Sequence, residues 1–412
     1  MKRFVISQNT ILLALFFVIS ACSQKSSNPQ PQKASNLAIT SINVTTGPYN
    51  TQVIINGTGF DATKANDNVF FNGKAATITA ATITRLTATV PVGAGTGVVT
   101  VSVNNGTPVA GPVFTYQVTA TVTTFAGSGL TGFTDSQGTG ASFSGLWGIA
   151  IDPSGNLFVT DVSLVRKIMP DATVRFFAGN VSGGYQDGKG SLASFQEPWG
   201  ITCDATGNLY VADMLKIRKV TPDGTVSTIQ SSSAFFADYK GVVLDAAGNL
   251  FALDAGNRLI LKISTDGATG TLASDFAYPR AICIDKAGDL FVADEGANKV
   301  IMVTSSGTVT TLAGSGAKGA NDGPAMSASF KDITGIAVDA AGNVYVSDSG
   351  NYTIRMITPD GTVSTIAGNG IQGFKDGQGL SSQLFSPQNL SIDNSGNIYV
   401  ADDLKVRKIT LQ

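Results

Sequence analysis

Short runs of alternating hydrophobic and polar residues cover most of the chain, and turn-forming residues separate them. Typical runs are LTATV at 86–90 and GVVTVSV at 97–103, and glycine-rich segments follow or precede many of them. Alternation with a period of two, interrupted by glycine, asparagine and aspartate, predicts β-strands joined by tight turns. We therefore predict an all-β protein: a small sandwich followed by a larger array of repeated strands.

Residues 37–117 form the predicted sandwich. The strand-like runs in this segment are AITSINV, TQVIING, VFFNG, LTATV, GVVTVSV and VFTY. Several short strands at regular spacing are typical of an immunoglobulin-like sandwich. The phrases ITSINVTTGP, VIINGTGF, VFFNGKAATI and the final FTY occur in the order found in IPT/TIG domains, and the segment resembles that family. The resemblance implies an immunoglobulin-like module that acts as a spacer or binds a partner.

Residues 120–412 carry a repeat. The phrase GNLFVTD at 155–161 returns in five further variants, the last being GNIYVAD at 396–402. Periods of 40 to 54 residues with four short strands each indicate the blades of a β-propeller. The repeats resemble the NHL family, which implies six blades here. The predicted innermost strands start at Gly148, Gly200, Gly241, Ala281, Gly335 and Asn389.

The two ends of the repeat array complement one another. The last repeat stops at VRKITLQ, which corresponds to a third strand, and no fourth strand follows. Before the first repeat stands VTTFAG at 122–127, which matches the fourth strand VSTIAG at 363–368. We therefore predict that the N-terminal strand completes the sixth blade, so that the ring closes without an exposed edge.

The first residues are typical of a targeting segment. Lys2 and Arg3 precede the apolar run ILLALFFVIS at 11–20, and its last two residues begin the sequence ISAC at 19–22. Residues 1–22 resemble a bacterial lipoprotein signal peptide, which implies lipid attachment at Cys22; an ordinary secretory signal is the alternative. Residues 23–36 are polar and predict a flexible linker. We expect a protein anchored by lipid to a membrane of the bacterial cell envelope, the outer membrane, with no cue for its surface or periplasmic face.

Composition excludes several functions. Only 14% of residues are charged, the isoelectric point is near 5.2 and no cluster of lysine and arginine stands out, so nucleic acid is not an expected partner. The chain contains no histidine. Histidine-dependent triads, and the histidine chemistry of some propeller lyases, are therefore excluded. We expect no enzyme, no cofactor and no metal, with a metal-dependent hydrolase or lactonase as the low-ranking alternative.

A candidate ligand site comes from positions where the repeats differ. The residue just before the start of each innermost strand differs from repeat to repeat, and no structural role requires such variety. Both tryptophans of the chain stand at this position, in the first two repeats. Indole faces stack on sugars and on cations, while lysine and arginine hold carboxylates. We expect these six residues to ring the channel mouth; packing of both tryptophans under the loops is the alternative. They are Trp147, Trp199, Lys240, Arg280, Thr334 and Gln388.

The loops that enter the repeats differ in length. Four are long, and the two that enter repeats three and four are short. If the long loops stand up, they leave a notch over blades three and four, lined by Lys240, Arg280, Tyr239 and Tyr278, where an acidic glycan or peptide could enter. If they lie flat, they act as lids instead.

Aspartates recur at fixed offsets in the repeats. Those of the long loops are Asp135, Asp187, Asp322 and Asp376, for which we expect turn capping, with calcium binding as the alternative. Those that end the second strands are expected to pair with the arginines of the third strands. We expect both series to serve the scaffold.

The predicted function is that of a non-enzymatic cell-envelope lipoprotein whose propeller top binds a ligand. A lipid anchor followed by an IPT/TIG module and an NHL propeller looks like the proteins of glycan-harvesting bacteria, so a carbohydrate is the favoured ligand. The alternative is an interaction scaffold for other envelope proteins.

Overall fold

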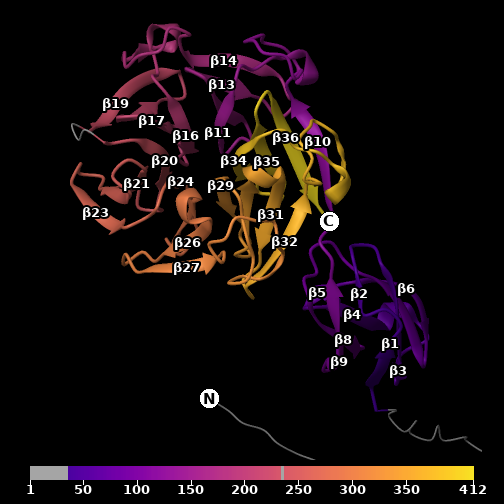
Figure 1. Ribbon diagram of the computed structural model, residues 1–412. Helices are drawn as coiled ribbons and strands as arrows, with labels where there is room; N and C mark the ends of the chain where they lie inside the picture. The colour runs from indigo at the N-terminus through magenta and orange to yellow at the C-terminus, as the bar shows by residue number, and fades with distance from the viewer. Residues whose placement is uncertain (1–35, 233–235) are drawn as a thin grey trace, which may run out of the picture.

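The computed structural model describes residues 36–232 and 236–412, and it shows two β-units joined by a short link (Figure 1). Strands and single 3-10 turns account for the regular structure of these residues, and none of them forms an α-helix. None of their helical segments has the length and hydrophobicity needed to cross a bilayer. The predicted all-β class is confirmed. The proposed signal peptide, Cys22 and nearly all of the linker lie outside the described residues.

The first unit is a sandwich of two sheets around one core. Phe71 and Phe114 pack edge to face at its centre, with ring centroids 5.1 Å apart. The first sheet has the order β1 (Ala38–Ile42), β3 (Gln52–Thr58), β7 (Arg85–Thr89) and β6 (Thr77–Thr82). The second has the order β2 (Thr46–Gly47), β9 (Val109–Tyr116), β8 (Gly97–Val103), β4 (Asp67–Phe71) and β5 (Lys74–Ala75).

The second unit is a ring of six blades whose innermost strands contact one another in a closed circle. Each blade has four main strands, and in blades 2, 5 and 6 a two-residue loop strand pairs with the fourth strand: β15 (Gly188–Lys189), β28 (Gly323–Pro324) and β33 (Gly377–Gln378). In blade order, these innermost strands are β11 (Leu146–Ile151), β16 (Pro198–Cys203), β20 (Tyr239–Leu244), β24 (Pro279–Ile284), β29 (Ile333–Val338) and β34 (Pro387–Ile392). The second strands are β12 (Leu157–Asp161), β17 (Leu209–Asp213), β21 (Leu250–Asp254), β25 (Leu290–Asp294), β30 (Val344–Asp348) and β35 (Ile398–Asp402).

The outer half of each blade is a third and a fourth strand. The third strands are β13 (Leu164–Ile168), β18 (Lys216–Val220), β22 (Leu259–Ile263), β26 (Lys299–Val303), β31 (Thr353–Ile357) and β36 (Lys405–Leu411). The fourth strands of blades 1 to 5 are β14 (Val174–Gly179), β19 (Thr225–Ser231), β23 (Thr269–Ser274), β27 (Val309–Ala313) and β32 (Thr362–Ala367).

Blade 6 takes its fourth strand from the N-terminal side of the repeats. Strand β10 (Ala120–Ala126) pairs antiparallel with β36, with Val122 opposite Ile409. Thr119 and Gln412 exchange backbone hydrogen bonds of 2.9 and 2.8 Å at the end of this ladder. The predicted closure is confirmed, and it joins segments almost three hundred residues apart.

A tight turn at one end of each blade explains part of the repeated phrase. In blade 1, the Asp152 carboxylate accepts hydrogen bonds from the amides of Ser154 (2.9 Å) and Asn156 (2.8 Å) and from the Asn156 side chain (2.7 Å). Gly155 has φ of 81°, which a residue with a side chain rarely adopts. We call the end of the ring with these turns the bottom, and the opposite end the top.

A single residue, Val118, joins the two units. Its side chain packs against the sandwich core and also against the core shared by blades 5 and 6. The neighbours on both sides are held, because Gln117 donates to the carbonyl of Gly47 (2.9 Å) and Thr119 is paired with Gln412. In Figure 1 the C-terminus lies beside this link. Few backbone torsions are therefore left free between the units.

The centre of the ring holds a cavity of about 220 Å³ lined by the innermost strands. Most residues that line it have apolar side chains, and the lining includes Cys203 and Cys283, which are both free thiols. Burial raises the pKa of Cys203 to about 12, so this thiol is not a reactive thiolate near neutral pH.

Candidate ligand-binding surface at the channel mouth

Four of the predicted site residues form one continuous stack across the top of the channel. The ring centroids of Trp147 and Trp199 lie 4.1 Å apart with their planes tilted by 54°. The Lys240 ammonium lies 3.7 Å from the Trp199 ring centroid, and the Arg280 guanidinium carbon lies 4.7 Å from it. These residues come from the innermost strands of blades 1 to 4, and we call them the mouth cluster.

Close contact between neighbouring innermost strands positions the two indoles. The Thr160 hydroxyl donates to the Trp199 carbonyl (2.9 Å) and accepts from the Gly148 amide (2.7 Å), which ties blade 1 to blade 2. A Cβ atom at Gly148 would lie 2.2 Å from the Trp199 carbonyl oxygen. The glycine that starts the repeat is thus required sterically, and it sets the approach of one blade to the next.

Each cation of the mouth cluster has a carboxylate partner. Lys240 pairs with Asp238 at 3.0 Å, and Arg280 Nε pairs with Glu295 at 3.2 Å. The Lys240 side chain is only 6% exposed. Burial lowers the pKa of Lys240, and the neighbouring Asp238 opposes that shift. Sequence reasoning missed both acidic partners, although Asp238 lies two positions before Lys240 and therefore on the same side of an extended strand.

Tyr239 does not line a notch, so that prediction was wrong. Its side chain is 2% exposed and packs with Ala212 and Ile217 between blades 2 and 3. The reason is strand alternation, because a side chain next to Lys240 points the other way. Tyr278 is 38% exposed, and the Arg280 guanidinium lies 5.9 Å from its ring centroid. Tyr278 thus lies at the edge of the mouth cluster.

The remaining two predicted residues are engaged within blades 5 and 6. The Thr334 hydroxyl donates to the Pro387 carbonyl (2.8 Å), and the Gln388 amide donates to the Ser386 hydroxyl (2.9 Å). The Thr334 bond joins the innermost strands of blades 5 and 6, whereas the Gln388 bond stays within blade 6. Thr334 therefore links two blades, and Gln388 is held by its own strand entry.

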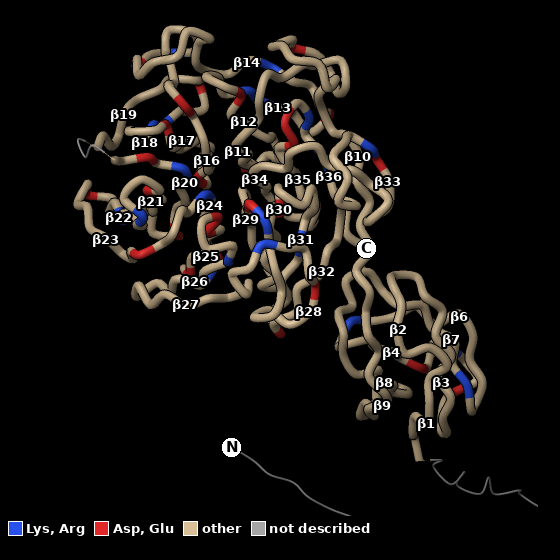
Figure 2. The backbone as a smooth tube through the Cα atoms, viewed as in Figure 1, with Lys and Arg blue, Asp and Glu red and all other residues tan. Residues whose placement is uncertain are grey.

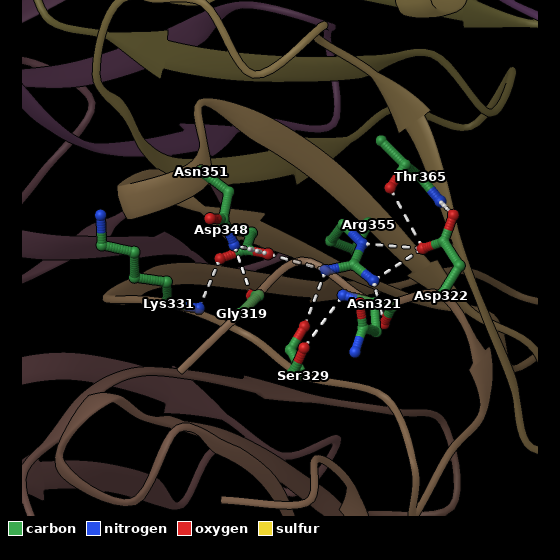
Figure 3. Close-up of polar contacts among 9 residues, drawn as sticks. All are labelled: Gly319, Asn321, Asp322, Ser329, Lys331, Asp348, Asn351, Arg355 and Thr365. Atoms are coloured by element: carbon green, nitrogen blue, oxygen red, sulfur yellow. Dashed lines mark hydrogen bonds and ion pairs between the residues drawn. The ribbon is translucent and has the colours of Figure 1, made fainter. Parts of the chain in front are cut away.

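A buried arginine holds the long loop of blade 5 against its own blade (Figure 3). Arg355 donates to the second-strand Asp348 (2.8 Å), to the loop carbonyl of Ser329 (3.0 Å) and to the loop Asp322 (2.6 Å). The other oxygen of Asp322 accepts the amide of Thr365 on the fourth strand (3.0 Å). We call this set the arginine clamp.

The same clamp occurs in all four blades with a long loop. The arginine, second-strand aspartate and loop aspartate are Arg166, Asp161 and Asp135 in blade 1; Arg218, Asp213 and Asp187 in blade 2; and Arg407, Asp402 and Asp376 in blade 6. The predicted pairing of second-strand aspartates with arginines is confirmed for these blades.

The clamps decide the shape of the top face. Each loop aspartate reaches the fourth strand of its own blade, so the loop lies across the blade and does not stand up as a wall. The expected turn-capping role was wrong for these aspartates, because they bind an arginine and a strand amide. Among residues 36–232 and 236–412, no group of three or more histidine, cysteine, aspartate or glutamate side chains is placed to hold a metal ion.

Charged groups are interspersed along the described chain, as Figure 2 shows. Basic and acidic positions are scattered over the ring in this view.

Comparison with known proteins assigns the first unit and the overall architecture. Residues 37–122 match the family model of the IPT/TIG domain. The chloroplastic protein SUPPRESSOR OF QUENCHING 1 of Arabidopsis thaliana is 36% identical over 85 residues, which cover 20% of this chain and 8% of that protein. The chain therefore spans a small part of that relative's length.

Two solved structures resemble nearly the whole chain. A protein of unknown function from Bacteroides thetaiotaomicron has a TM-score of 0.64 at 20% identity, covering 93% of this chain and 99% of its own. An auxiliary nutrient binding protein from Bacteroides ovatus has a TM-score of 0.60 at 18% identity, covering 91% and 98%. At these identities the likeness shows the fold: an IPT/TIG domain followed by a propeller.

Proposed function

We propose that this chain is a non-enzymatic binding protein of the bacterial cell envelope, and that the top of its propeller binds a carbohydrate. The observation that carries the proposal is the mouth cluster. Both tryptophans of the chain, a lysine and an arginine meet at one place, although they come from four blades. Aromatic faces bordered by charged hydrogen-bonding groups suit the alternating apolar faces and hydroxyls of a sugar.

The name of one similar solved structure supports a binding role. One structure with the same two-unit fold is named an auxiliary nutrient binding protein. The 412 residues include no histidine, and the carboxylates of the loops are held in arginine clamps. A metal-dependent hydrolase or lactonase would need side chains that are available to bind the metal ion, so we rank that function lower.

Attachment to the membrane through a lipid on Cys22 is part of the proposal. Its support is the sequence of residues 1–22 alone. Expression of the full chain in a bacterial host with a radioactive or clickable palmitate tests it. Label should appear on the wild-type protein and be absent from Cys22→Ser; equal labelling of the two would contradict lipid attachment at this residue.

Tryptophan fluorescence of the chain without residues 1–22 tests ligand binding, because every tryptophan lies in the mouth cluster. A saturable change with one polysaccharide of a panel is expected, and Trp147→Ala should weaken it at least about tenfold, the loss of about 1.4 kcal/mol. Phe133→Ala, which alters an exposed aromatic of the blade 1 loop, is the matched control. Flat titrations, together with repeated capture of envelope proteins, would favour the scaffold alternative.

A further inference from the structure

We infer that the carbohydrate bound at the mouth cluster is neutral, and that it stacks on Trp147 while Trp199 serves as a positioning residue. This inference rests on the proposed carbohydrate binding and names the class of sugar. It differs from the acidic glycan or peptide that the sequence allowed at a notch over blades 3 and 4, where the cations were considered without their partners.

The charges of the mouth nearly cancel. Asp238 neutralises Lys240, and Glu295 neutralises Arg280, each within 3.2 Å. Glu197, two residues before Trp199, adds a third carboxylate close enough to stabilise the charged form of Lys240. Two cations thus face three carboxylates, and the mouth carries no positive excess that would attract an anion.

An acidic sugar would have to displace one of these carboxylates. The Lys240 side chain is 6% exposed and that of Arg280 is 16% exposed, so each keeps little contact with water that could stabilise a second anion. Displacing Asp238 or Glu295 would leave that carboxylate unpaired beside the incoming one, and like charges in a partly buried interface are costly. A neutral sugar avoids this, because its hydroxyls can accept from the cations and donate to the carboxylates without separating the pairs.

The two tryptophans have different surroundings. Trp199 is in contact with Trp147, Lys240 and Arg280 at once, and its indole nitrogen is buried without a hydrogen bond to any described residue. Three side chains thus surround the Trp199 ring and hold it in place. Both tryptophans are partly exposed, but Trp147 stands at the end of the stack with Trp199 on one side of it, so we assign to Trp147 the ring face that is offered to a sugar.

A matched pair of polysaccharides tests the charge class. Homogalacturonan is used in its fully methyl-esterified, neutral form and in its de-esterified, acidic form, beside neutral galactomannan and arabinoxylan. Calorimetry with the chain lacking residues 1–22 is run at about 50 mM and about 500 mM NaCl, since salt screens exposed charges within a few ångströms at the higher concentration.

The expected result is binding of at least one neutral polysaccharide, with a Kd that changes less than about twofold between the two salt concentrations. Binding of the de-esterified form alone, weakening about tenfold or more in high salt, would overturn the neutral class and leave carbohydrate binding intact. Failure of every polysaccharide to bind would overturn the proposed function itself, and the inference with it.

Variants separate the roles of the residues. Trp147→Ala should weaken binding of the neutral probe at least about tenfold, whereas Trp199→Phe, which keeps an aromatic support, should weaken it by less than about fivefold, or under 1 kcal/mol. The double variant Asp238→Asn with Glu295→Gln releases both cations from their partners. It should gain binding of de-esterified homogalacturonan that is sensitive to salt. No gain in a folded double variant would show that paired carboxylates are not what excludes acidic sugars.

Discussion

Blades 1, 2, 5 and 6 differ from blades 3 and 4 in how they use buried charge. In the first group, an arginine at the third position of the third strand clamps a long loop. In the second group, Leu261 and Ile301 occupy the equivalent positions, and the loops are short. One cation from each of blades 3 and 4, Lys240 and Arg280, lies instead at the channel mouth. The ring thus separates blades with buried clamps from blades that carry the cationic part of the candidate site.

In the two short-loop blades, which have no clamp arginine, the second-strand aspartates are bound by other hydrogen-bond donors. The Asp254 carboxylate accepts the amides of Asp238 and Asn257, both at 3.0 Å, and the Asn257 side chain at 2.8 Å. Asp294 accepts the amides of Ala277 and Tyr278, each at 2.8 Å. Equivalent backbone amides also bind the second-strand aspartates of the four clamp blades, so the short-loop blades keep these amide bonds and lack the guanidinium. In every blade, the second-strand aspartate thus binds the backbone just before the innermost strand, whether or not that blade also has an arginine clamp.

The strongest test of this comparison is Arg355→Met. It removes the guanidinium from buried Asp348 and releases the loop, and we expect a loss of about 3 to 5 kcal/mol in the free energy of unfolding. Leu261→Met at the equivalent position of blade 3 is the control and should cost less than about 1.5 kcal/mol. Urea unfolding measures both. Similar losses in the two variants would mean that the clamp contributes no more than ordinary packing.

The loss in Arg355→Met should depend on pH. Burial raises the pKa of Asp348 above its ordinary range even with Arg355 present, and removal of the guanidinium raises it further. A carboxyl with a raised folded-state pKa binds a proton on folding, so its stabilising contribution is present at low pH and is lost as the pH rises through that pKa. The variant should therefore recover part of its deficit when unfolding is measured at pH 5 instead of pH 7. A constant deficit would contradict this cause.

Removal of the exposed half of a clamp should have a smaller effect. Asp322 is 46% exposed, and Asp322→Ala breaks its bonds to Arg355 and to the Thr365 amide, which we expect to cost about 1 to 2 kcal/mol. Hydrogen exchange at Thr365 should become faster. Exchange at Thr271, its counterpart in blade 3, should stay unchanged; acceleration at both sites would indicate a global effect.

The smallest effect is expected for Tyr278→Ala in blade 4. The side chain is 38% exposed, and the free energy of unfolding should change by less than about 0.5 kcal/mol. Tyr239→Ala, which empties a buried position in blade 3, should cost about 3 to 5 kcal/mol. Thermal unfolding of the two variants therefore checks which tyrosine of the short-loop blades belongs to the core and which to the surface.

The sequence by itself determined features that depend on neighbours along the chain. Strand alternation, the Asp152-type turns and the match between residues 122–127 and 363–368 led to the six-bladed ring and its closure. The position just before each innermost strand led to Trp147, Trp199, Lys240 and Arg280, because a repeat places equivalent residues at equivalent points of a ring. These inferences need only the period of the repeat and the geometry of a strand.

Only the tertiary structure decided which groups meet across longer separations. Arg355 and Asp322 are 33 positions apart, and their contact depends on the path of a loop that has no periodic pattern. The pairing of Lys240 with Asp238 and of Arg280 with Glu295 depends on rotamers and on the tilt of neighbouring blades, and so does the set of side chains around Trp199. Side-chain charge and burial are properties of the packed ring, which is why the sequence indicated a cationic mouth and the structure shows one whose charges are paired.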